Sequence, residues 1–235
     1  MERTYVGNIK ESKETTFLVK GWIHKIHDLG QITFIQLRDK TGILQLVLDG
    51  KIDKSLRLEM CIEAVGEKVE NEKAFMGVEL LVKEIKVLGK AYYNTLPFEI
   101  NNHTVSASLE KQLDYRSISL RSQKIRAVFR VQEEIVEAFR NYLRERGFSE
   151  IHTPKIIASS TEGGSEMFTV NYFERRAFLA QSPQFYKQMM VGAGFEKVFE
   201  IGAAYRAELH NTWRHLNEYI SLDVEMGFIK DENDL

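Results

Sequence analysis

The sequence has very little cysteine and proline, and it has no long apolar run. Cys61 is the single cysteine, and there are three prolines among the 235 residues. One cysteine excludes an internal disulfide framework and a cysteine-based zinc site, and it favours a reducing compartment. No apolar run approaches the roughly 18 residues that span a bilayer, and no N-terminal leader pattern is present. We therefore expect a soluble, cytoplasmic protein.

The charge balance is close to neutral, with a formal net charge of −2. This argues against bulk nucleic-acid binding, although a near-neutral total can still contain a local basic face. Hydrophobic residues make up 43% of the chain and charged residues 28%, which is typical of a globular protein. The length allows one large domain or two ordinary ones.

Residues 15–88 contain five short segments with the composition and alternation of β-strands. Five strands in roughly 75 residues are typical of a five-stranded, partly open barrel, the OB-fold, which binds oligonucleotides on an exposed sheet face. We therefore predict an all-β OB-fold domain over residues 1–90. The five segments are TFLVKGWIHKI, QITFIQLRD, GILQLVLDG, CIEAVGEKV and GVELLVKEIKVL.

Two residues of these segments are candidates for contacts with bases. Phe34 lies in the second segment, next to Gln36 in the alternation, and Gln45 lies in the third. An aromatic ring on the exposed face of such a barrel stacks on bases. An aromatic residue in a strand is also commonly part of the core, so both interpretations of Phe34 stand at this point.

Residues 91–121 are irregular in pattern, with a proline and a serine-rich run, and we predict a linker there. A helical pattern follows, with Ser122 as the expected N-cap and Gly147 as the expected C′ residue. This helix opens a second domain, of α+β type, over residues 122–235. We expect it to bury its apolar face, which carries Ile125, Val128, Val131, Ile135, Phe139 and Tyr142.

Two later segments alternate like paired strands. Odd positions are polar in residues 215–225, and even positions are polar or small in residues 200–208. If the strands pair, their polar sides form one floor, with an exposed loop over residues 209–214. The connecting stretch RAELHNTWRHLNEY mixes arginine, glutamate, histidine and aromatic residues. An anionic ligand site and a solvated face of an antiparallel sheet are both consistent with this pattern.

The segment QSPQFYKQMM predicts a helix with Ser182 as its N-cap and Pro183 at its first position. Gln184 and Lys187 lie one turn apart, so they present an amide and an ammonium on the same face. Upstream, TEGGSEMF places two glycines directly after Glu162, in a loop able to bring a carboxylate over a small ligand.

In this order, the segments resemble a class II aminoacyl-tRNA synthetase, and specifically an aspartyl-tRNA synthetase of the archaeal-like type. The resemblance covers the whole chain. It rests on the barrel, the linker LDYRSISLR, the segments GFSEIHTPKI, EGGSEMF and QSPQFYKQ, and the hairpin YRAELHNTWRHLNEY continuing into SLDVEMGFI.

The resemblance implies an aminoacyl-tRNA ligase. Such an enzyme joins L-aspartate to ATP as aspartyl-adenylate, and then transfers the aspartyl group to tRNA(Asp). The resemblance also implies Mg²⁺ alongside ATP, and a homodimer in which the long helix and GFSEIHTPKI lie at the interface between subunits.

The resemblance assigns Arg206, Glu208 and His215 as catalytic residues, and it assigns ATP binding to these three and Tyr219. Arg206 would hold the α-phosphate and stabilise charge during the displacement. Glu208 would accept a hydrogen bond from the adenine amino group. His215 would approach the phosphates, and Tyr219 would stack on the adenine ring.

The same resemblance places the aspartate pocket at Glu162, Gln184 and Lys187. The first two would address the α-ammonium group of the substrate, and the lysine would face its side-chain carboxylate. Asp223 and Glu225 lie deeper on the same polar face, and their roles stay open.

In the barrel, the resemblance matches Phe34 to the aromatic residue that stacks on an anticodon base, and Gln45 to a residue that reads a base edge. By this resemblance, His24 occupies the position at which archaeal-like enzymes that are strict for tRNA(Asp) tend to carry tryptophan. A histidine there resembles relaxed enzymes that also charge tRNA(Asn).

The sequence departs from the family pattern in one respect. The third signature, whose arginine grips the γ-phosphate, would follow residue 235, as would the magnesium-binding carboxylates and a further arginine of the aspartate pocket. We therefore expect the 235 residues to be inactive by themselves, as a fragment or a truncated gene product. Two alternatives stay open: a catalytically inactive, tRNA-binding paralogue and an asparagine–tRNA ligase. Lys187 argues against the latter, because an asparagine amide carries no charge.

Overall fold

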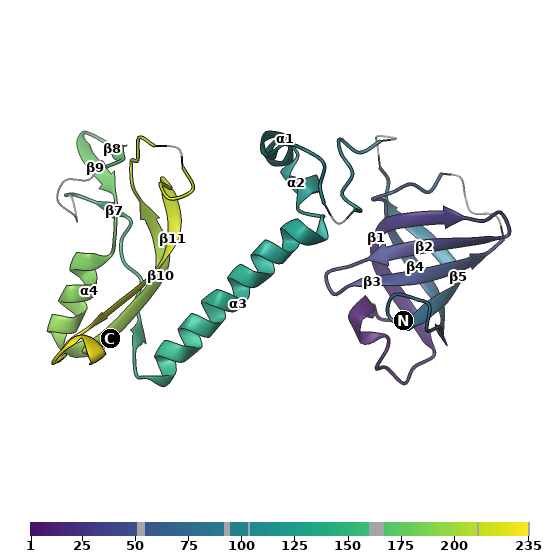
Figure 1. The fold of residues 1–235 in the computed structure, drawn as a ribbon, viewed down its shortest axis with the longest axis horizontal. Helices are drawn as coiled ribbons and strands as arrows, with labels where there is room; N and C mark the ends of the chain where they lie inside the picture. The colour runs from purple at the N-terminus through teal and green to yellow at the C-terminus, as the bar shows by residue number, and fades with distance from the viewer. Residues whose placement is uncertain (51–54, 92–94, 103, 160–166, 211, 235) are drawn as a thin grey trace. The chain divides into compact units, whose positions relative to one another are not determined.

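The computed structural model describes residues 1–50, 55–91, 95–102, 104–159, 167–210 and 212–234. The chain forms two compact units, Met1–Arg126 and Ala127–Leu235. Figure 1 shows a barrel in the first unit and small sheets with helices in the second. No helix in these described ranges is long and apolar enough to cross a membrane.

The first unit is built around a closed barrel with the strand order β1-β2-β3-β5-β4. Each strand lies where the sequence predicted one. The barrel is closed, and not partly open as predicted, because β3 pairs in parallel with β5 over three residues and the first half of β1, residues 16–22, pairs with β4. The strands are β1 (Thr16–Asp28), β2 (Ile32–Arg38), β3 (Ile43–Asp49), β4 (Cys61–Glu70) and β5 (Val78–Gly89).

Alternation along the strands separates the barrel core from its outer surface. In β2, Thr33, Ile35 and Leu37 are fully buried, whereas Phe34 and Gln36 between them are half-buried. Successive strand residues point to opposite faces, so Phe34 lies on the outside of the barrel. The interpretation of Phe34 as a core residue is therefore wrong.

Short helices flank the barrel in sequence. The 3₁₀ helix η1 (Val6–Asn8) precedes β1, and α1 (Leu109–Asp114) and α2 (Arg116–Ser119) lie in the segment predicted to be an irregular linker. The Ser108 hydroxyl accepts a hydrogen bond from the Lys111 N–H at 3.3 Å, which caps α1. The serine-rich run therefore supplies a helix start.

The long helix α3 (Gln123–Glu145) begins and ends close to the predicted residues. Gly147 adopts φ +80° and Phe148 N–H donates to the Leu143 carbonyl at 3.1 Å, which confirms the glycine C′ ending. Ser122 directly precedes the helix, and its carbonyl accepts from Arg126 N–H at 3.0 Å. Its buried Oγ has no hydrogen-bond partner among the described residues, so its side chain does not cap the helix.

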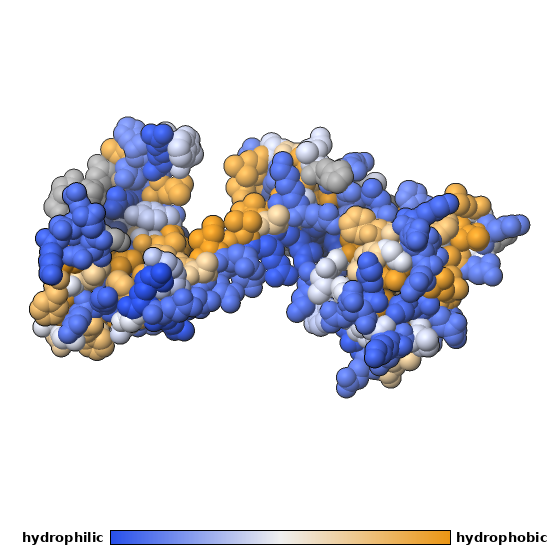
Figure 2. All heavy atoms as spheres, turned by 60° about the horizontal axis from the view of Figure 1, so that its bottom comes forward, coloured by the Kyte–Doolittle hydropathy of each residue, from blue (hydrophilic) through white to orange (hydrophobic). Residues whose placement is uncertain are grey.

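Most of the apolar face of α3 is exposed, contrary to the prediction that this face is buried. Leu143 is buried near the C-terminal end, and Phe139 packs edge-to-face on Phe199 with ring centroids 5.9 Å apart. Further towards the N-terminus nothing in the described second unit covers the stripe, which Figure 2 shows as orange side chains along one side of the helix. The exposed members are Val128, Val131, Ile135 and Tyr142.

The second unit contains two three-stranded sheets with the orders β11-β10-β6 and β7-β9-β8. The helix α4 (Gln184–Met190) packs on β10 and β11, and a π-helical turn η2 (Val191–Phe195) follows it. The 3₁₀ helix η3 (Glu232–Asp234) lies near the C-terminus. The strands are β6 (Ser149–Glu150), β7 (Ile156–Ile157), β8 (Thr169–Tyr172), β9 (Arg175–Leu179), β10 (Lys197–Tyr205) and β11 (Glu218–Met226).

β10 and β11 pair antiparallel, as the alternation predicted. Their polar sides lie on one face, because the register sets residues of like position opposite each other. The loop between them is exposed, with Leu209 at 82% and Trp213 at 80%. The facing pairs on the polar floor are Glu200 with Asp223, Gly202 with Ser221, and Ala204 with Tyr219.

Candidate functional site

The helix α4 lies over the polar floor and starts one residue later than predicted. Pro183 has φ −84° and ψ 12°, which are not helical angles, so it occupies the N-cap position and not the first helical position. Ser182 Oγ still accepts from Gln184 N–H at 3.4 Å. This start leaves Gln184 and Lys187 on the side of α4 that faces the sheet.

Lys187 lies between α4 and β11, with its side chain 4% exposed. Its Nζ lies 3.1 Å from Asp223 Oδ1, 3.2 Å from the Val224 carbonyl oxygen and 3.5 Å from Glu225 Oε2. Gln184 Nε2 donates to Glu225 Oε2 at 3.1 Å. The structure thus brings Gln184 and Lys187 together, and it gives Asp223 and Glu225 a position: they hold the amide and the ammonium from below.

Glu200 forms a second polar cluster on the same floor, and its residue is 2% exposed. Its Oε2 lies 2.9 Å from Lys155 Nζ, and its Oε1 accepts from Thr153 N–H at 2.7 Å. At Gly202, an added Cβ would lie 3.2 Å from both Glu200 Cδ and Lys155 Nζ, so glycine keeps the pair in place. Sequence reasoning missed Lys155 and Thr153. The only feature that could have indicated them was Glu200 itself, because a glutamate that is buried in a strand needs a charged or hydrogen-bonding partner.

The hairpin residues lie at the end of this floor where β10 leads into the loop. Arg206 N–H donates to the Asn217 carbonyl and Glu208 N–H to Asn217 Oδ1, both at 3.0 Å. The Arg206 guanidinium carbon lies 6.0 Å from the centroid of the Tyr219 ring. His215 is exposed. Asn217, which sequence reasoning did not single out, thus fixes the arm that carries Arg206 and Glu208.

Thr212 and His215 close the tip of the hairpin. His215 Nδ1 lies 2.7 Å from Thr212 Oγ1, and the two residues form an isolated β-bridge. Glu162, the remaining predicted residue of this site, lies outside the described residues.

A row of polar side chains crosses the outer face of the barrel. The register aligns Lys25 of β1, Gln36 of β2, Gln45 of β3 and Glu79 of β5. Gln45 Nε2 donates to Glu79 Oε2 at 2.8 Å, which orients the amide so that its oxygen is left for another donor.

Phe34 lies in the neighbouring row, opposite His27 on β1 and Val47 on β3. Its ring is half-buried, and it lies two residues before Gln36 on the same face of β2, so it is next to the polar row. The structure therefore brings Phe34 and Gln45 together on one accessible sheet face, which is the arrangement by which barrels of this kind stack and read bases.

His24 has a different environment from the residues of this face. It sits at a register shift between Ile23 and Lys25, and it is 5% exposed. Its Nδ1 lies 2.8 Å from Arg38 Nη1, and its carbonyl accepts from Asn101 Nδ2 at 2.6 Å. Burial, followed by the charge of Arg38, lowers the pKa of His24 to about 4.

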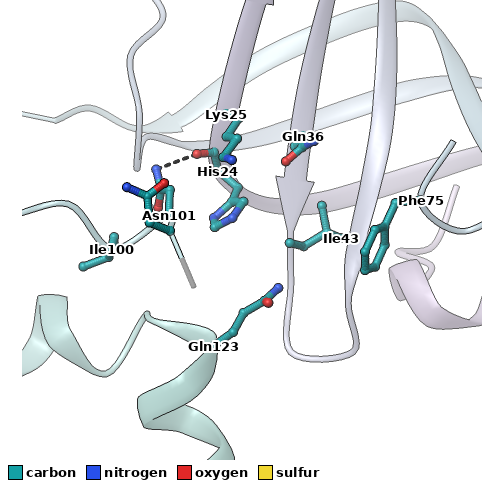
Figure 3. Close-up of a pocket in the computed structure, with 9 residues that line it drawn as sticks. His24, Lys25, Gln36, Ile43, Phe75, Ile100, Asn101 and Gln123 are labelled. Atoms are coloured by element: carbon teal, nitrogen blue, oxygen red, sulfur yellow. Dashed lines mark hydrogen bonds between the residues drawn. The ribbon is translucent and has the colours of Figure 1, made fainter. Parts of the chain in front are cut away.

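A pocket of about 460 Å³ opens beside this histidine, within the first unit. Figure 3 shows the His24 ring pointing into it, with Gln123 and Ile43 across the space. The carboxamides of Gln36 and Asn101 also line it. Such groups both donate and accept hydrogen bonds, which suits the edges of nucleic-acid bases.

Comparison with known families decides what this combination of units represents. The family model described as "tRNA synthetases class II (D, K and N)" matches residues 108–235, which is more than half of the 235-residue chain. The chain belongs to this family. A second model, "OB-fold nucleic acid binding domain", matches residues 17–88.

Curated relatives of this class II synthetase are similar along almost its whole length. It is 46% identical over 235 residues to an aspartate–tRNA(Asp/Asn) ligase of Archaeoglobus fulgidus, covering 96% of this chain and 54% of the relative. It is 50% identical over 223 residues to one of Methanopyrus kandleri, covering 92% and 51%. The synthetase chain thus spans about half the length of the curated relatives it matches.

Solved structures show the same fold in both asparaginyl and aspartyl enzymes. An asparaginyl-tRNA synthetase of Pyrococcus horikoshii, complexed with asparaginyl-adenylate, matches with a TM-score of 0.89 and 30% identity, over 97% of this chain and 54% of that one. A putative aspartyl-tRNA synthetase of Leishmania major matches with a TM-score of 0.84 and 29% identity, over 99% and 49%.

Class II tRNA synthetases are aminoacyl-tRNA ligases that use ATP and Mg²⁺. Within the described ranges of this synthetase, no group of three or more His, Cys, Asp or Glu is arranged to hold a metal ion. The carboxylates of the floor do not fit a magnesium site, because Asp223 and Glu225 surround the Lys187 ammonium and Glu200 holds that of Lys155.

Proposed function

We propose that this protein acts as an aspartate–tRNA ligase, which activates L-aspartate with ATP and transfers it to tRNA(Asp), with tRNA(Asn) as a second acceptor. The observation that carries the proposal is the nearly buried Lys187, held over the floor by Asp223 and the Val224 carbonyl. Eight of its curated relatives, from archaea and bacteria, bear the name aspartate–tRNA(Asp/Asn) ligase. We propose that the activity is cytoplasmic, because archaea and bacteria synthesise their proteins in the cytoplasm.

Lys187 is suited to selecting a substrate carboxylate. Its ammonium is fixed by bonds from below, so little side-chain entropy is lost when a carboxylate binds from above. Two carboxylates, Asp223 and Glu225, stand against this one cation. The net charge of these three groups is negative, so a further cation would be favourable here, such as the arginine that the family resemblance places after residue 235. Gln184 and Glu162 complete the proposed pocket at the α-ammonium end.

The hairpin supplies the ATP contacts in this proposal. Arg206 would bind the α-phosphate and stabilise the charge that develops there when the aspartate carboxylate attacks and pyrophosphate leaves. Tyr219 would stack on adenine, and Glu208 would accept from the adenine amino group. His215, exposed at the tip, would approach the phosphates. In-line displacement of this kind depends on positioning and charge stabilisation more than on covalent participation of the protein.

The barrel would bind the anticodon of the tRNA. Phe34 offers a half-buried ring on the outer face, and Gln45 offers an oriented amide two positions away across the sheet. His24 lines the adjoining pocket and is the residue that we propose to bear on the choice between tRNA(Asp) and tRNA(Asn).

We also propose that the exposed stripe of α3 is covered in a homodimer. Val128 is 63% exposed, Val131 57% and Ile135 51%, at helical spacing. A regular apolar stripe of this kind on a helix buries itself against a partner surface.

Charging assays test the proposal as a whole. Residues 1–235 would be joined to the remaining residues of the Archaeoglobus fulgidus relative, and aspartate transfer to tRNA(Asp) and tRNA(Asn) would be measured. We expect both tRNAs to be charged with aspartate. Charging of tRNA(Asp) alone would show that tRNA(Asn) is not a second acceptor. Charging of tRNA(Asn) with asparagine would favour an asparagine–tRNA ligase. RNA binding without charging, by a chimera that is folded, would favour the inactive paralogue.

A further inference from the structure

A chain of three buried polar side chains, Glu59, Arg38 and His24, ends at the pocket that His24 lines. Arg38 is 2% exposed and Glu59 is 7% exposed. Arg38 Nη2 donates to Glu59 Oε2 at 2.8 Å, and its Nη1 lies 2.8 Å from His24 Nδ1. One guanidinium therefore joins a carboxylate on one side to an imidazole on the other.

The partner of His24 determines where the imidazole proton lies. A guanidinium has five N–H donors, no acceptor, and does not lose its proton in proteins. In the contact between them, Nδ1 of His24 must accept through its lone pair, so the proton of the neutral ring is on Nε2. Within the described residues, Nε2 has no hydrogen-bond partner.

We infer that Arg38 is a positioning residue that holds His24 as a neutral imidazole protonated on Nε2, so that the pocket presents a fixed hydrogen-bond donor to RNA. This inference rests on the proposed binding of an anticodon by the barrel. It assigns Arg38 a role through His24 and no contact with RNA of its own.

The surroundings of the ring favour the neutral form. The charged groups that act on it are Arg38, Lys25 and Glu59, and burial together with the two cations outweighs the carboxylate, so the pKa of His24 falls to about 4. The ring therefore stays uncharged in the range where an exposed histidine would titrate.

Glu59 and Arg121 keep Arg38 in position. Glu59 Oε2 also accepts from Arg121 Nη1 at 3.0 Å, so two guanidinium groups share one buried carboxylate oxygen. Glu59 adopts φ +63°, and its N–H donates to the Ile23 carbonyl at 2.8 Å, next to His24. A left-handed backbone at a non-glycine residue costs free energy, so the surrounding contacts must hold it there.

A fixed donor selects bases by their acceptors. The codons for aspartate and asparagine begin with G and A, so the third anticodon positions are cytosine and uracil. These two bases differ at the exocyclic group of C4 and at N3, but both carry an acceptor oxygen on C2. A single N–H donor aimed at that shared oxygen accepts both, which agrees with two tRNA acceptors in the proposed function.

The tautomer can be measured without RNA. Long-range ¹H–¹⁵N spectra of the 235-residue chain, with His24→Gln to assign the signal, distinguish a protonated from an unprotonated ring nitrogen. We expect an unprotonated Nδ1 and a protonated Nε2 from pH 8 down to about pH 5. In Arg38→Met we expect the pKa of His24 to rise, because the charge of Arg38 is lost while burial still lowers it, and we expect the proton of the neutral ring to be shared between Nδ1 and Nε2. Arg38→Lys, which keeps a cation beside Glu59, serves if the methionine variant does not fold. A proton on Nδ1, or titration near pH 6.5 in the wild-type chain, overturns the inference.

Binding of two anticodon stem-loop RNAs, with the aspartate and the asparagine anticodon, then connects the tautomer to recognition. We expect comparable affinity of the wild-type chain for both, and about tenfold weaker, pH-dependent binding by Arg38→Met. Arg130→Met, on the exposed side of α3, is the control and should bind as wild type. Unchanged binding by a folded Arg38→Met chain contradicts the role of Arg38. If the wild-type chain binds neither RNA, the proposed anticodon binding fails, and the spectra still decide whether Arg38 fixes His24.

Discussion

Lys187 Nζ lies 3.1 Å from Asp223 Oδ1, and this pair joins α4 to β11 across the floor of the second unit. Both side chains are largely removed from solvent, at 4% and 21% exposure. The first prediction follows from this position. In the full-length chimera, Lys187→Leu should lower kcat/KM for aspartate activation by a factor that corresponds to ~2–4 kcal/mol of lost transition-state stabilisation, because a desolvated substrate carboxylate loses its charged partner.

Two comparisons make this test specific. Activation of asparagine should fall less than activation of aspartate, since the amide carries no charge. Lys197→Met is the matched control, because Lys197 alternates with the floor residues of β10 and so faces away from the floor, where its Nζ lies 5.5 Å from the centroid of the Phe148 ring. An equal loss for both amino acids would show that Lys187 does not read the substrate side chain.

The second prediction concerns ATP. The 235-residue chain should bind ATP weakly by calorimetry and should not form aspartyl-adenylate at a useful rate, because the family resemblance places the arginine that grips the γ-phosphate after residue 235. Tyr219→Leu should weaken this binding by about 1–3 kcal/mol, the usual contribution of a stacked base. Tyr142→Leu, which removes an exposed tyrosine of α3, should have no effect. Equal weakening by both variants would argue against adenine stacking on Tyr219.

The third prediction is a pH dependence of stability that originates at His24. Its pKa is about 4 in the folded chain and 6.5 ordinarily, so between these values the unfolded chain binds a proton that the folded chain does not. Stability must then rise with pH in this window and level off above it. The contribution lost between pH 7.5 and pH 5 should be about 2 kcal/mol.

Urea unfolding of the wild-type chain and of His24→Gln at both pH values isolates this term. Other groups titrate equally in the two chains, so the difference between them reports His24. If the two chains lose the same stability between pH 7.5 and pH 5, the pKa of His24 is not lowered by folding.

The fourth prediction concerns the exposed stripe of α3. Val131→Lys should shift the full-length chimera from dimer to monomer in sedimentation equilibrium, because it places a charge in an apolar interface. Gln132→Lys, one residue further on and outside the stripe, should leave the dimer intact. A wild-type chimera that is monomeric at high concentration would contradict a homodimer formed through this stripe.

The strand arrangement of this chain was largely predictable from sequence. Period-2 alternation placed the five barrel strands, and it placed the polar sides of β10 and β11 on one floor. Gly147 was identified as a helix end, because a residue with positive φ is most often glycine. In each case a local rule and the fold agree.

Contacts between distant segments could not be predicted in the same way. A register shift in β1 turns His24 towards Arg38 and Glu59, and no local pattern marks that shift. The helical spacing of α3 correctly identified an apolar face, but spacing alone does not show what covers it. Asp223 was recognised as part of the floor, whereas its bond to Lys187 depends on how α4 packs.

The most direct test of the account is amino-acid-dependent ATP–pyrophosphate exchange by the full-length chimera that begins with residues 1–235. It measures the activation step alone and needs no tRNA. We predict rapid exchange with aspartate and little with asparagine, with the preference reduced by Lys187→Leu. Exchange that depends on asparagine and not on aspartate would contradict the account.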